Sequence, residues 1–100
     1  MDFSKIKKIS WAITAIAEFE RAFDFIYLEN PQAAINFSKQ ITQAIKKLPM
    51  FPQLGRLIPE IAEPRYREII VGEYRILHEI QEHEIRIFSI FHSARNFDFT

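Results

Sequence analysis

Residues 66–95 read YREIIVGEYRILHEIQEHEIRIFSIFHSAR, and this stretch decides the fold. The pair Gly72-Glu73 separates two runs in which apolar and polar residues alternate. Glycine at the first central position is what a type II′ turn requires, so the pair predicts a tight β-hairpin. A second two-residue turn at Glu82-His83 extends this hairpin into a three-stranded antiparallel meander.

The two turns fix how the three strands pair. A one-residue slip would move every side chain to the other face of the sheet, so the pairing also decides which residues face the core. Glu79 opposite Arg86 supports the predicted pairing, because opposite charges across a ladder contribute up to about 1 kcal/mol. The predicted cross-strand pairs are Val71 with Tyr74, Ile69 with Ile76, Arg67 with His78, Ile70 with Arg75, Glu79 with Arg86, Leu77 with Phe88, and Arg75 with Ile90.

The two faces of the predicted meander differ in character. One face is almost continuously apolar and is therefore the predicted core side, whereas the other mixes apolar and charged residues. On the mixed face Arg75 and His92 are diagonal neighbours about 7 to 8 Å apart, a gap that long side chains span. The core side carries Ile69, Val71, Tyr74, Ile76, Ile80, Ile85, Ile87 and Phe91, and the mixed face carries Glu68, Ile70, Arg75, Leu77, Glu79, Arg86, Phe88, Ile90 and His92.

Upstream of the meander, the pattern predicts a strand followed by two helices. Residues 5–11 alternate weakly and add the strand, and from Ile13 the apolar spacing becomes helical. Asn30-Pro31 ends the first helix and begins the second, because proline suits a first helical position after an asparagine cap. A proline-punctuated connection at residues 50–59 follows the second helix. The helical stripes are Ile16, Phe19, Phe23 and Ile26, then Ala34, Phe37, Ile41, Ile45 and Leu48.

These elements predict an α+β fold in one domain, residues 1–100, with the order β-α-α-β-β-β. An N-terminal strand precedes an antiparallel helical hairpin, which packs on an antiparallel sheet completed by the C-terminal meander. Phe25 and Leu28 fall off the apolar stripe of the first helix. Exposed apolar residues of this kind mark partner surfaces, so these two are candidate binding residues.

The composition excludes several classes of protein. One hundred residues with 48% hydrophobic content and ten phenylalanines are enough to form a core. No apolar run approaches the roughly 20 residues that cross a bilayer, and no signal-peptide pattern is present, so we expect a cytoplasmic protein without a membrane partner. The chain has no cysteine, which fits a reducing compartment, and its three histidines lack metal-site spacing. We therefore expect no metal and no cofactor.

The charges are balanced in number but uneven in kind. Thirteen basic and thirteen acidic residues give a net charge of zero, so we expect no sequence-specific DNA binding by this chain. All six lysines lie at or before Lys47, and only arginine is used beyond it. Arginine offers a planar fork for phosphate or carboxylate, which suits a site or an interface on the sheet. The alternative is that the glutamates of the same segment neutralise these arginines.

The order of elements and a set of short motifs resemble the RelE/ParE superfamily of toxins from bacterial toxin–antitoxin systems. The resemblance covers residues 6–95. His78 stands where a tyrosine is common in that family, and its core-side position predicts a structural role. The matching residues are Asn30-Pro31, Ala33-Ala34, Phe37, Leu48, Phe51-Pro52-Gln53-Leu54-Gly55-Arg56, Pro59-Glu60, Arg67, Val71-Gly72-Glu73-Tyr74-Arg75-Ile76 and His92-Ser93-Ala94-Arg95.

The resemblance implies one of two toxic mechanisms. The neutral charge and the long helical hairpin favour the ParE-like branch, which acts on DNA gyrase and is not a nuclease. The alternative is the RelE-like branch, a ribosome-dependent endoribonuclease that cuts messenger RNA. Under that alternative His92 would be the acid or base and Arg75 and Arg95 would clamp the phosphate. The outer contacts to target or phosphate would come from Arg56, Arg65 and Arg67.

The resemblance also implies a partner. Toxins of this superfamily, including those of plasmid stabilisation modules, are neutralised by a cognate antitoxin, and an inactive relic would retain only that binding. A disordered segment that folds as it binds covers a large surface. The candidate antitoxin-binding residues are Phe25, Leu28, Leu77 and Phe88. The target partner would be gyrase, or the ribosome with its message under the alternative.

Overall fold

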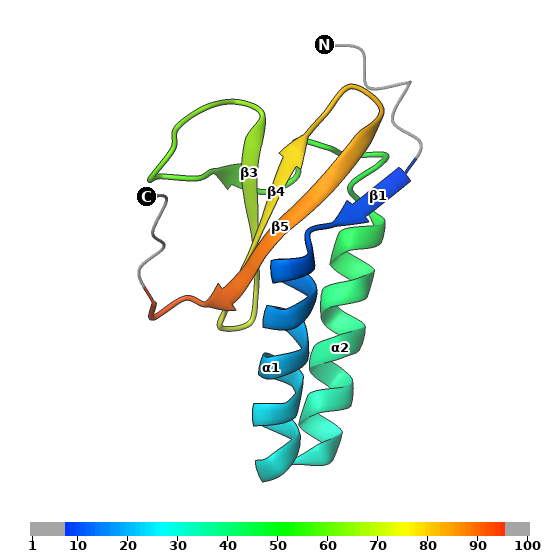
Figure 1. Cartoon of the computed structure of the whole chain (residues 1–100), viewed down its shortest axis with the longest axis vertical. Coiled ribbons are helices and arrows are strands. Elements are labelled where there is room, and N and C mark those ends of the chain that lie inside the picture. Colours follow the sequence, from blue (N-terminus) through cyan, green and yellow to red (C-terminus); the bar gives the residue numbers. More distant parts are fainter. Residues whose placement is uncertain (1–7, 96–100) are drawn as a thin grey trace.

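The computed structural model describes residues 8–95 and consists of a mixed five-stranded sheet and a helical hairpin (Figure 1). The predicted α+β fold and the order of its helices and meander strands are confirmed. The described part of the predicted N-terminal strand begins at residue 8, and residues 5–7 lie outside the described range. The elements are β1 (Lys8–Trp11), α1 (Ile13–Glu29), α2 (Pro31–Lys46), β2 (Arg56–Leu57), β3 (Tyr66–Val71), β4 (Tyr74–Ile80) and β5 (Glu84–His92).

The sheet has the strand order β1-β5-β4-β3-β2, and each of its edge strands has a feature that was not predicted. Strand β1 pairs parallel with β5, so the sheet is mixed and not wholly antiparallel. Both helices lie between β1 and the meander in the chain, so no hairpin turn constrains the direction of β1. At the other edge, the predicted loop contains the short strand β2, which pairs antiparallel with β3.

The helical hairpin turns at the predicted boundary. The side-chain Oδ1 of Asn30 accepts a hydrogen bond of 3.1 Å from the backbone N–H of Ala33, which caps the start of α2. The backbone N–H of Asn30 also closes α1 by donating to the carbonyl oxygen of Ile26 at 2.9 Å. Pro31 is the first residue of α2, where its missing N–H leaves no hydrogen bond unmade.

The helices cover one face of the sheet, which we call the helix-side face. Aromatic rings join the two layers: Phe19 of α1 contacts Phe37 of α2 at 5.7 Å between ring centroids, and Phe37 contacts Tyr74 of β4 at 4.8 Å. Ile16, predicted on the core stripe, is 42% exposed, because Ala15 fills the core-facing position of that turn. The tip of the hairpin extends beyond the sheet (Figure 1).

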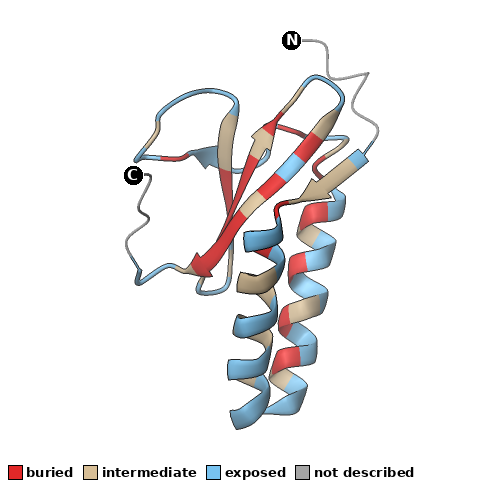
Figure 2. Cartoon of the chain, in the orientation of Figure 1, coloured by how far each residue is buried: buried red, intermediate tan, exposed pale blue. Residues whose placement is uncertain are grey.

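The opposite face of the sheet, which we call the outer face, is also largely covered. The connection after α2 crosses it, and Ile58 from this connection is buried against Leu77 and Phe91. Figure 2 shows buried residues along the central strands and exposed ones over much of the helical surface. The predicted mixed face is this outer face. The prediction that only the apolar face belongs to the core is therefore wrong, because the connection forms a second apolar cluster on the outer face.

Candidate functional site

The pairing of β4 with β5 differs from the prediction after the first few pairs. Glu79 lies opposite Arg86 as predicted, but a β-bulge between Leu77 and His78 leaves Phe88 as an extra residue of β5. Beyond the bulge each pair is shifted by one residue, so that Arg75 lies opposite Phe91 and not Ile90, and Leu77 lies opposite Ser89 and not Phe88.

The bulge reverses the faces of the last residues of β5. A shift of one residue turns every following side chain to the other side of the sheet. Ile90 therefore packs in the core beneath the helices, and Phe91 packs on the outer face. His92 lies opposite Tyr74 on the helix-side face, with the two rings 5.4 Å apart. The predicted diagonal proximity of Arg75 and His92 is wrong, since the two residues lie on opposite faces.

The bulge is held by a residue of α1 that the sequence did not single out. The carboxylate of Glu18 accepts a hydrogen bond from the hydroxyl of Ser89 at 3.1 Å and from the backbone N–H of Ile90 at 3.2 Å. Ser89 is buried, so these bonds give hydrogen-bond partners to buried polar groups at the point where the strand pairing is irregular.

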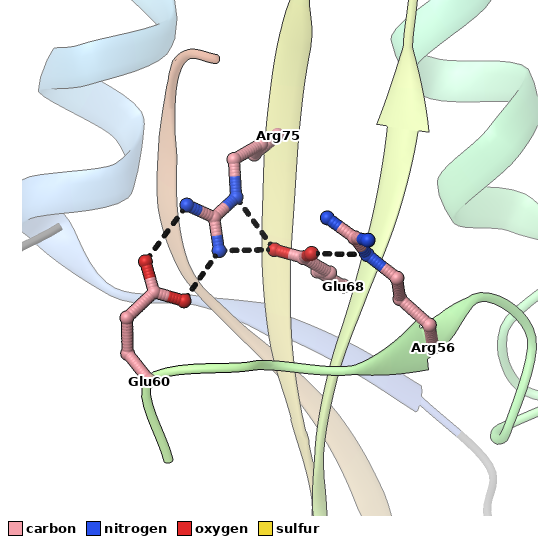
Figure 3. A network of polar contacts seen from close by, with 4 residues as sticks. All are labelled: Arg56, Glu60, Glu68 and Arg75. Atoms are coloured by element: carbon pink, nitrogen blue, oxygen red, sulfur yellow. Dashed lines mark hydrogen bonds and ion pairs between the residues drawn. The ribbon is translucent and has the colours of Figure 1, made fainter. Parts of the chain in front are cut away.

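On the outer face, Arg75 belongs to a group of four charged residues that we call the Glu68 network: Arg56, Glu60, Glu68 and Arg75 (Figure 3). Arg75 donates two parallel hydrogen bonds of 2.9 Å to the carboxylate of Glu60. Its Nε also donates to Glu68 at 2.6 Å, and the other oxygen of Glu68 accepts from Arg56 at 2.6 Å. Glu68 is completely buried and Arg75 is 8% exposed.

The hydrogen bonds of the network stabilise the charged forms of Glu60 and Arg75. The hydrogen bonds from Arg75 lower the pKa of the Glu60 carboxyl, and those to Glu60 raise the pKa of the Arg75 guanidinium. The guanidinium also lies over the ring of Phe91, with its central carbon 5.1 Å from the ring centroid. The donors of Arg75 are thus directed at partners within the chain and not at solvent.

His92 has hydrogen-bond partners for both ring nitrogens. Its Nδ1 accepts from the backbone N–H of Ala94 at 3.0 Å, so in the neutral ring Nε2 carries the proton. That Nε2 lies 3.3 Å from the carboxylate of Glu73, to which it donates. His92 is therefore oriented by the turn that follows β5 and by the hairpin turn before β4.

The remaining predicted arginines do not converge with His92 on one site. Arg65 lies over the ring of Tyr66 and 3.5 Å from Glu63, and the Nε of Arg67 donates to the carbonyl oxygen of Pro64 at 3.2 Å. Arg95 alone of the predicted arginines lines the same pocket as His92. The predicted cationic residues are thus divided between the outer face, the β3 end of the connection and this pocket.

The pocket lies between α1 and the end of β5 and has a volume of about 570 Å³. Sequence reasoning assigned roles to Phe25, His92 and Arg95 but missed the rest of its lining. A signal was present, because Glu18, Arg21 and Phe25 are spaced i, i+3 and i+7 and so share one helix face. The lining residues are Glu18, Arg21, Ala22, Phe25, Tyr74, Ile90, Phe91, His92, Ala94 and Arg95.

The four predicted antitoxin-binding residues fall into two groups. Phe25 is 66% exposed and Leu28 is 86% exposed, both on α1 toward the tip of the hairpin. Leu77 is completely buried beneath the connection, and Phe88 is partly buried beside it. In this conformation Leu77 offers no side-chain surface to a partner, because the second apolar cluster covers it.

His78 has a buried side chain that makes stability depend on pH. Its Nε2 donates to the carbonyl oxygen of Pro52 at 2.8 Å, and its Nδ1 has no partner among the described residues. Burial lowers the pKa of His78 below its ordinary value of 6.5, and the charge of Arg67 adds to this. The position is structural, as its predicted core-side location implied.

We expect the free energy of unfolding to fall as the pH drops below the ordinary histidine pKa of 6.5. The unfolded chain takes up a proton below about pH 6.5 that folded His78 resists, so stability should be full above about pH 7 and fall as the pH decreases through 6.5, with a slope of at most about 1.4 kcal/mol per pH unit for one group. Urea unfolding at a series of pH values measures this slope. The slope should vanish in His78→Gln and persist in His83→Gln, whose side chain is exposed; an unchanged slope in His78→Gln would contradict the assignment.

The fold and the site define a class of protein: a small α+β domain with a helical hairpin on a mixed sheet and no convergent cluster of the predicted catalytic groups within residues 8–95. The family model of the ParE toxin of the type II toxin–antitoxin system, parDE, matches residues 9–97. The chain therefore belongs to the ParE toxin family of type II toxin–antitoxin systems.

A solved structure agrees in fold. A chain of a chromosomal ParDE toxin–antitoxin system from P. aeruginosa matches with a TM-score of 0.71 and 19% sequence identity. The match covers 88% of this chain and 96% of the other. No curated protein matches this chain in sequence. Neither helix described in the structure has the length and apolar character needed to span a membrane.

Proposed function

We propose that this toxin acts on DNA gyrase without cutting nucleic acid and that a cognate antitoxin neutralises it. The observation that carries the proposal is the placement of Arg75 and His92 on opposite faces of the sheet. A ribonuclease needs a base, an acid and cations around one phosphate. Here the guanidinium of Arg75 is bound by Glu60 and Glu68, away from the pocket that His92 lines.

Two observations make the ribonuclease function the weaker candidate. Both ring nitrogens of His92 have partners within the chain, from Ala94 and Glu73, so proton transfer would require these bonds to break. The net charge of zero also disfavours the binding of RNA and ribosomes, which depends on neutralising phosphates with basic side chains. A toxin that acts on gyrase without cutting nucleic acid requires neither a free catalytic histidine nor a strongly basic surface.

The test is a pair of assays on the purified chain. Supercoiling by purified gyrase should be inhibited, while messenger RNA on ribosomes should stay intact. Cleavage of the message that is lost in His92→Ala would overturn the proposal and favour the ribonuclease. Failure of both activities, together with retained antitoxin binding, would identify an inactive relic.

Antitoxin binding should depend on the exposed residues of α1. We expect Phe25→Ala/Leu28→Ala to weaken the binding of the antitoxin encoded beside the toxin by at least about tenfold, because buried aromatic and aliphatic anchors dominate such interfaces. The side chains are exposed, so the free energy of unfolding should change by less than about 0.5 kcal/mol.

Isothermal titration calorimetry measures the affinity, and Met50→Ala is the matched control. Met50 is 77% exposed but lies beyond the C-terminal end of α2, far along the chain from the hairpin tip. Equal Kd values for the double variant and the wild type would rule out α1 as the docking surface.

A further inference from the structure

The pocket between α1 and the end of β5 contains two arginines that form no ion pair with a described residue. Within residues 8–95, neither Arg21 nor Arg95 forms an ion pair, whereas Arg56, Arg65 and Arg75 all do. Arg21 comes from α1 and Arg95 from the turn after β5, so the two approach the pocket from different elements.

The acidic residue in the pocket wall is already engaged. Both carboxylate oxygens of Glu18 lie within 3.3 Å of the hydroxyl of Ser89, and one also accepts from the N–H of Ile90. These donors are uncharged groups, so the Glu18 carboxylate forms no ion pair within residues 8–95 and lies beside the two arginines in the pocket wall. The balance favours a single carboxylate over a multiply charged phosphate.

The rest of the lining suits an apolar group beside that carboxylate. Phe25, Tyr74 and Ile90 form apolar walls, and Phe25 is 66% exposed. A segment that placed an acidic side chain between the arginines would bring a neighbouring residue against Phe25. Arginine pairs well with carboxylates because its planar fork donates two parallel hydrogen bonds.

We propose that this pocket is the docking site for an acidic side chain of the antitoxin, with its carboxylate between Arg21 and Arg95 and an adjacent apolar side chain against Phe25. The proposal rests on the proposed function only in assigning the acidic segment to the antitoxin. The preference of the pocket for a carboxylate beside an apolar group follows from its own lining.

The preference is tested first with small probes. In ¹⁵N–¹H NMR titrations of the wild-type protein, 3-phenylpropionate should cause saturable shifts at the pocket residues, with a Kd in the millimolar range expected for so small a ligand. The neutral amide of the same compound should bind about tenfold more weakly. Inorganic phosphate should bind more weakly than the acid.

Variants identify the groups responsible. Arg21→Gln should weaken the binding of 3-phenylpropionate by about three- to fivefold, the range of a single solvent-accessible ion pair. Arg86→Gln is the matched control, since Arg86 is exposed on β5 but does not line the pocket. Equal binding of acid and amide, tighter binding of phosphate, or absence of shifts in the pocket would each overturn the proposal.

A second measurement uses the antitoxin itself. Arg21→Gln/Arg95→Gln should weaken antitoxin binding by about tenfold and reduce its dependence on sodium chloride concentration, because ion pairs are screened by salt. Normal affinity of this double variant, when the wild type binds, overturns the docking site and leaves the proposed function standing. Failure of the wild type to bind any antitoxin contradicts the proposed function instead, and the probe titrations still test the pocket.

Discussion

Gly55→Ala is expected to destabilise the protein by about 3 kcal/mol or more. Gly55 has a φ of +93°, a backbone conformation that side chains other than glycine rarely adopt. An added Cβ would lie 2.0 Å from the carbonyl oxygen of Glu68 and 2.8 Å from the Cγ2 of Ile69. Backbone strain and overpacking each cost about 1 to 3 kcal/mol, and here they add.

The measurement is urea unfolding, with Gly72→Ala as the matched control. Gly72 also has a positive φ, of +58°, but an added Cβ there would meet no described atom within 4 Å beyond its chain neighbours. Only the backbone strain of about 1 kcal/mol therefore applies to Gly72→Ala. The difference between the two variants isolates the contact of Gly55 with β3. Equal losses in the two variants would show that β3 moves away at little cost.

Glu68→Leu is expected to cost about 3 to 5 kcal/mol, the range found when one partner is removed from a buried ion pair. Glu68 is completely buried and accepts from both Arg56 and Arg75. Its loss leaves the guanidinium of Arg75 buried with Glu60 as its remaining partner. Arg56 loses the side-chain hydrogen bond that joins the edge strand β2 to β3 in addition to their backbone pairing.

Two further variants make the Glu68 experiment specific. Glu63→Leu makes the same chemical change at an exposed position, where the ion pair with Arg65 contributes little, and should change stability by less than about 0.5 kcal/mol. Glu68→Leu/Arg75→Met replaces the buried pair by apolar side chains and should recover much of the loss. A loss below about 1 kcal/mol in Glu68→Leu would contradict a stabilising role for the network.

Local sequence signals predicted the first hairpin correctly. Gly72 has the positive φ that its turn requires, Glu73 is not among the residues with positive φ, and the pairs from Ile70–Arg75 outward lie as predicted. The second turn also forms, because the backbone N–H of Gln81 donates to the carbonyl oxygen of Glu84. Turn residues and strand alternation act over a few positions, so one sequence contains all the information that they need.

The register error arose from an interaction that no local pattern reveals. The bulge at Phe88 is accompanied by hydrogen bonds from Ser89 and Ile90 to Glu18, more than 70 residues earlier in the chain. The alternation of β5 breaks at Ile87-Phe88, and Ser89 falls on the predicted core side, but neither feature by itself shows that an extra residue is inserted there. The interpretation of Arg75 and His92 as neighbours failed for this reason alone.

The partners of Arg75 were partly predictable. The predicted pairing already placed Glu68 diagonally across from Arg75 on the same face, which is within reach of these side chains. Glu60 was not predictable in the same way, because its position depends on how the connection crosses the outer face. The general alternative that nearby glutamates neutralise the arginines is confirmed for Arg75.

The parallel pairing of β1 with β5 has a consequence for biosynthesis. Lys8 lies opposite Glu84, so the edge strand gains its neighbour only after 76 further residues have been added to the chain. Contacts over such separations are slow to form, since the closure of a long loop precedes any gain from it. Most of this chain is therefore synthesised before β1 can pair with β5. Until then the nascent chain has neither the complete sheet nor the folded pocket.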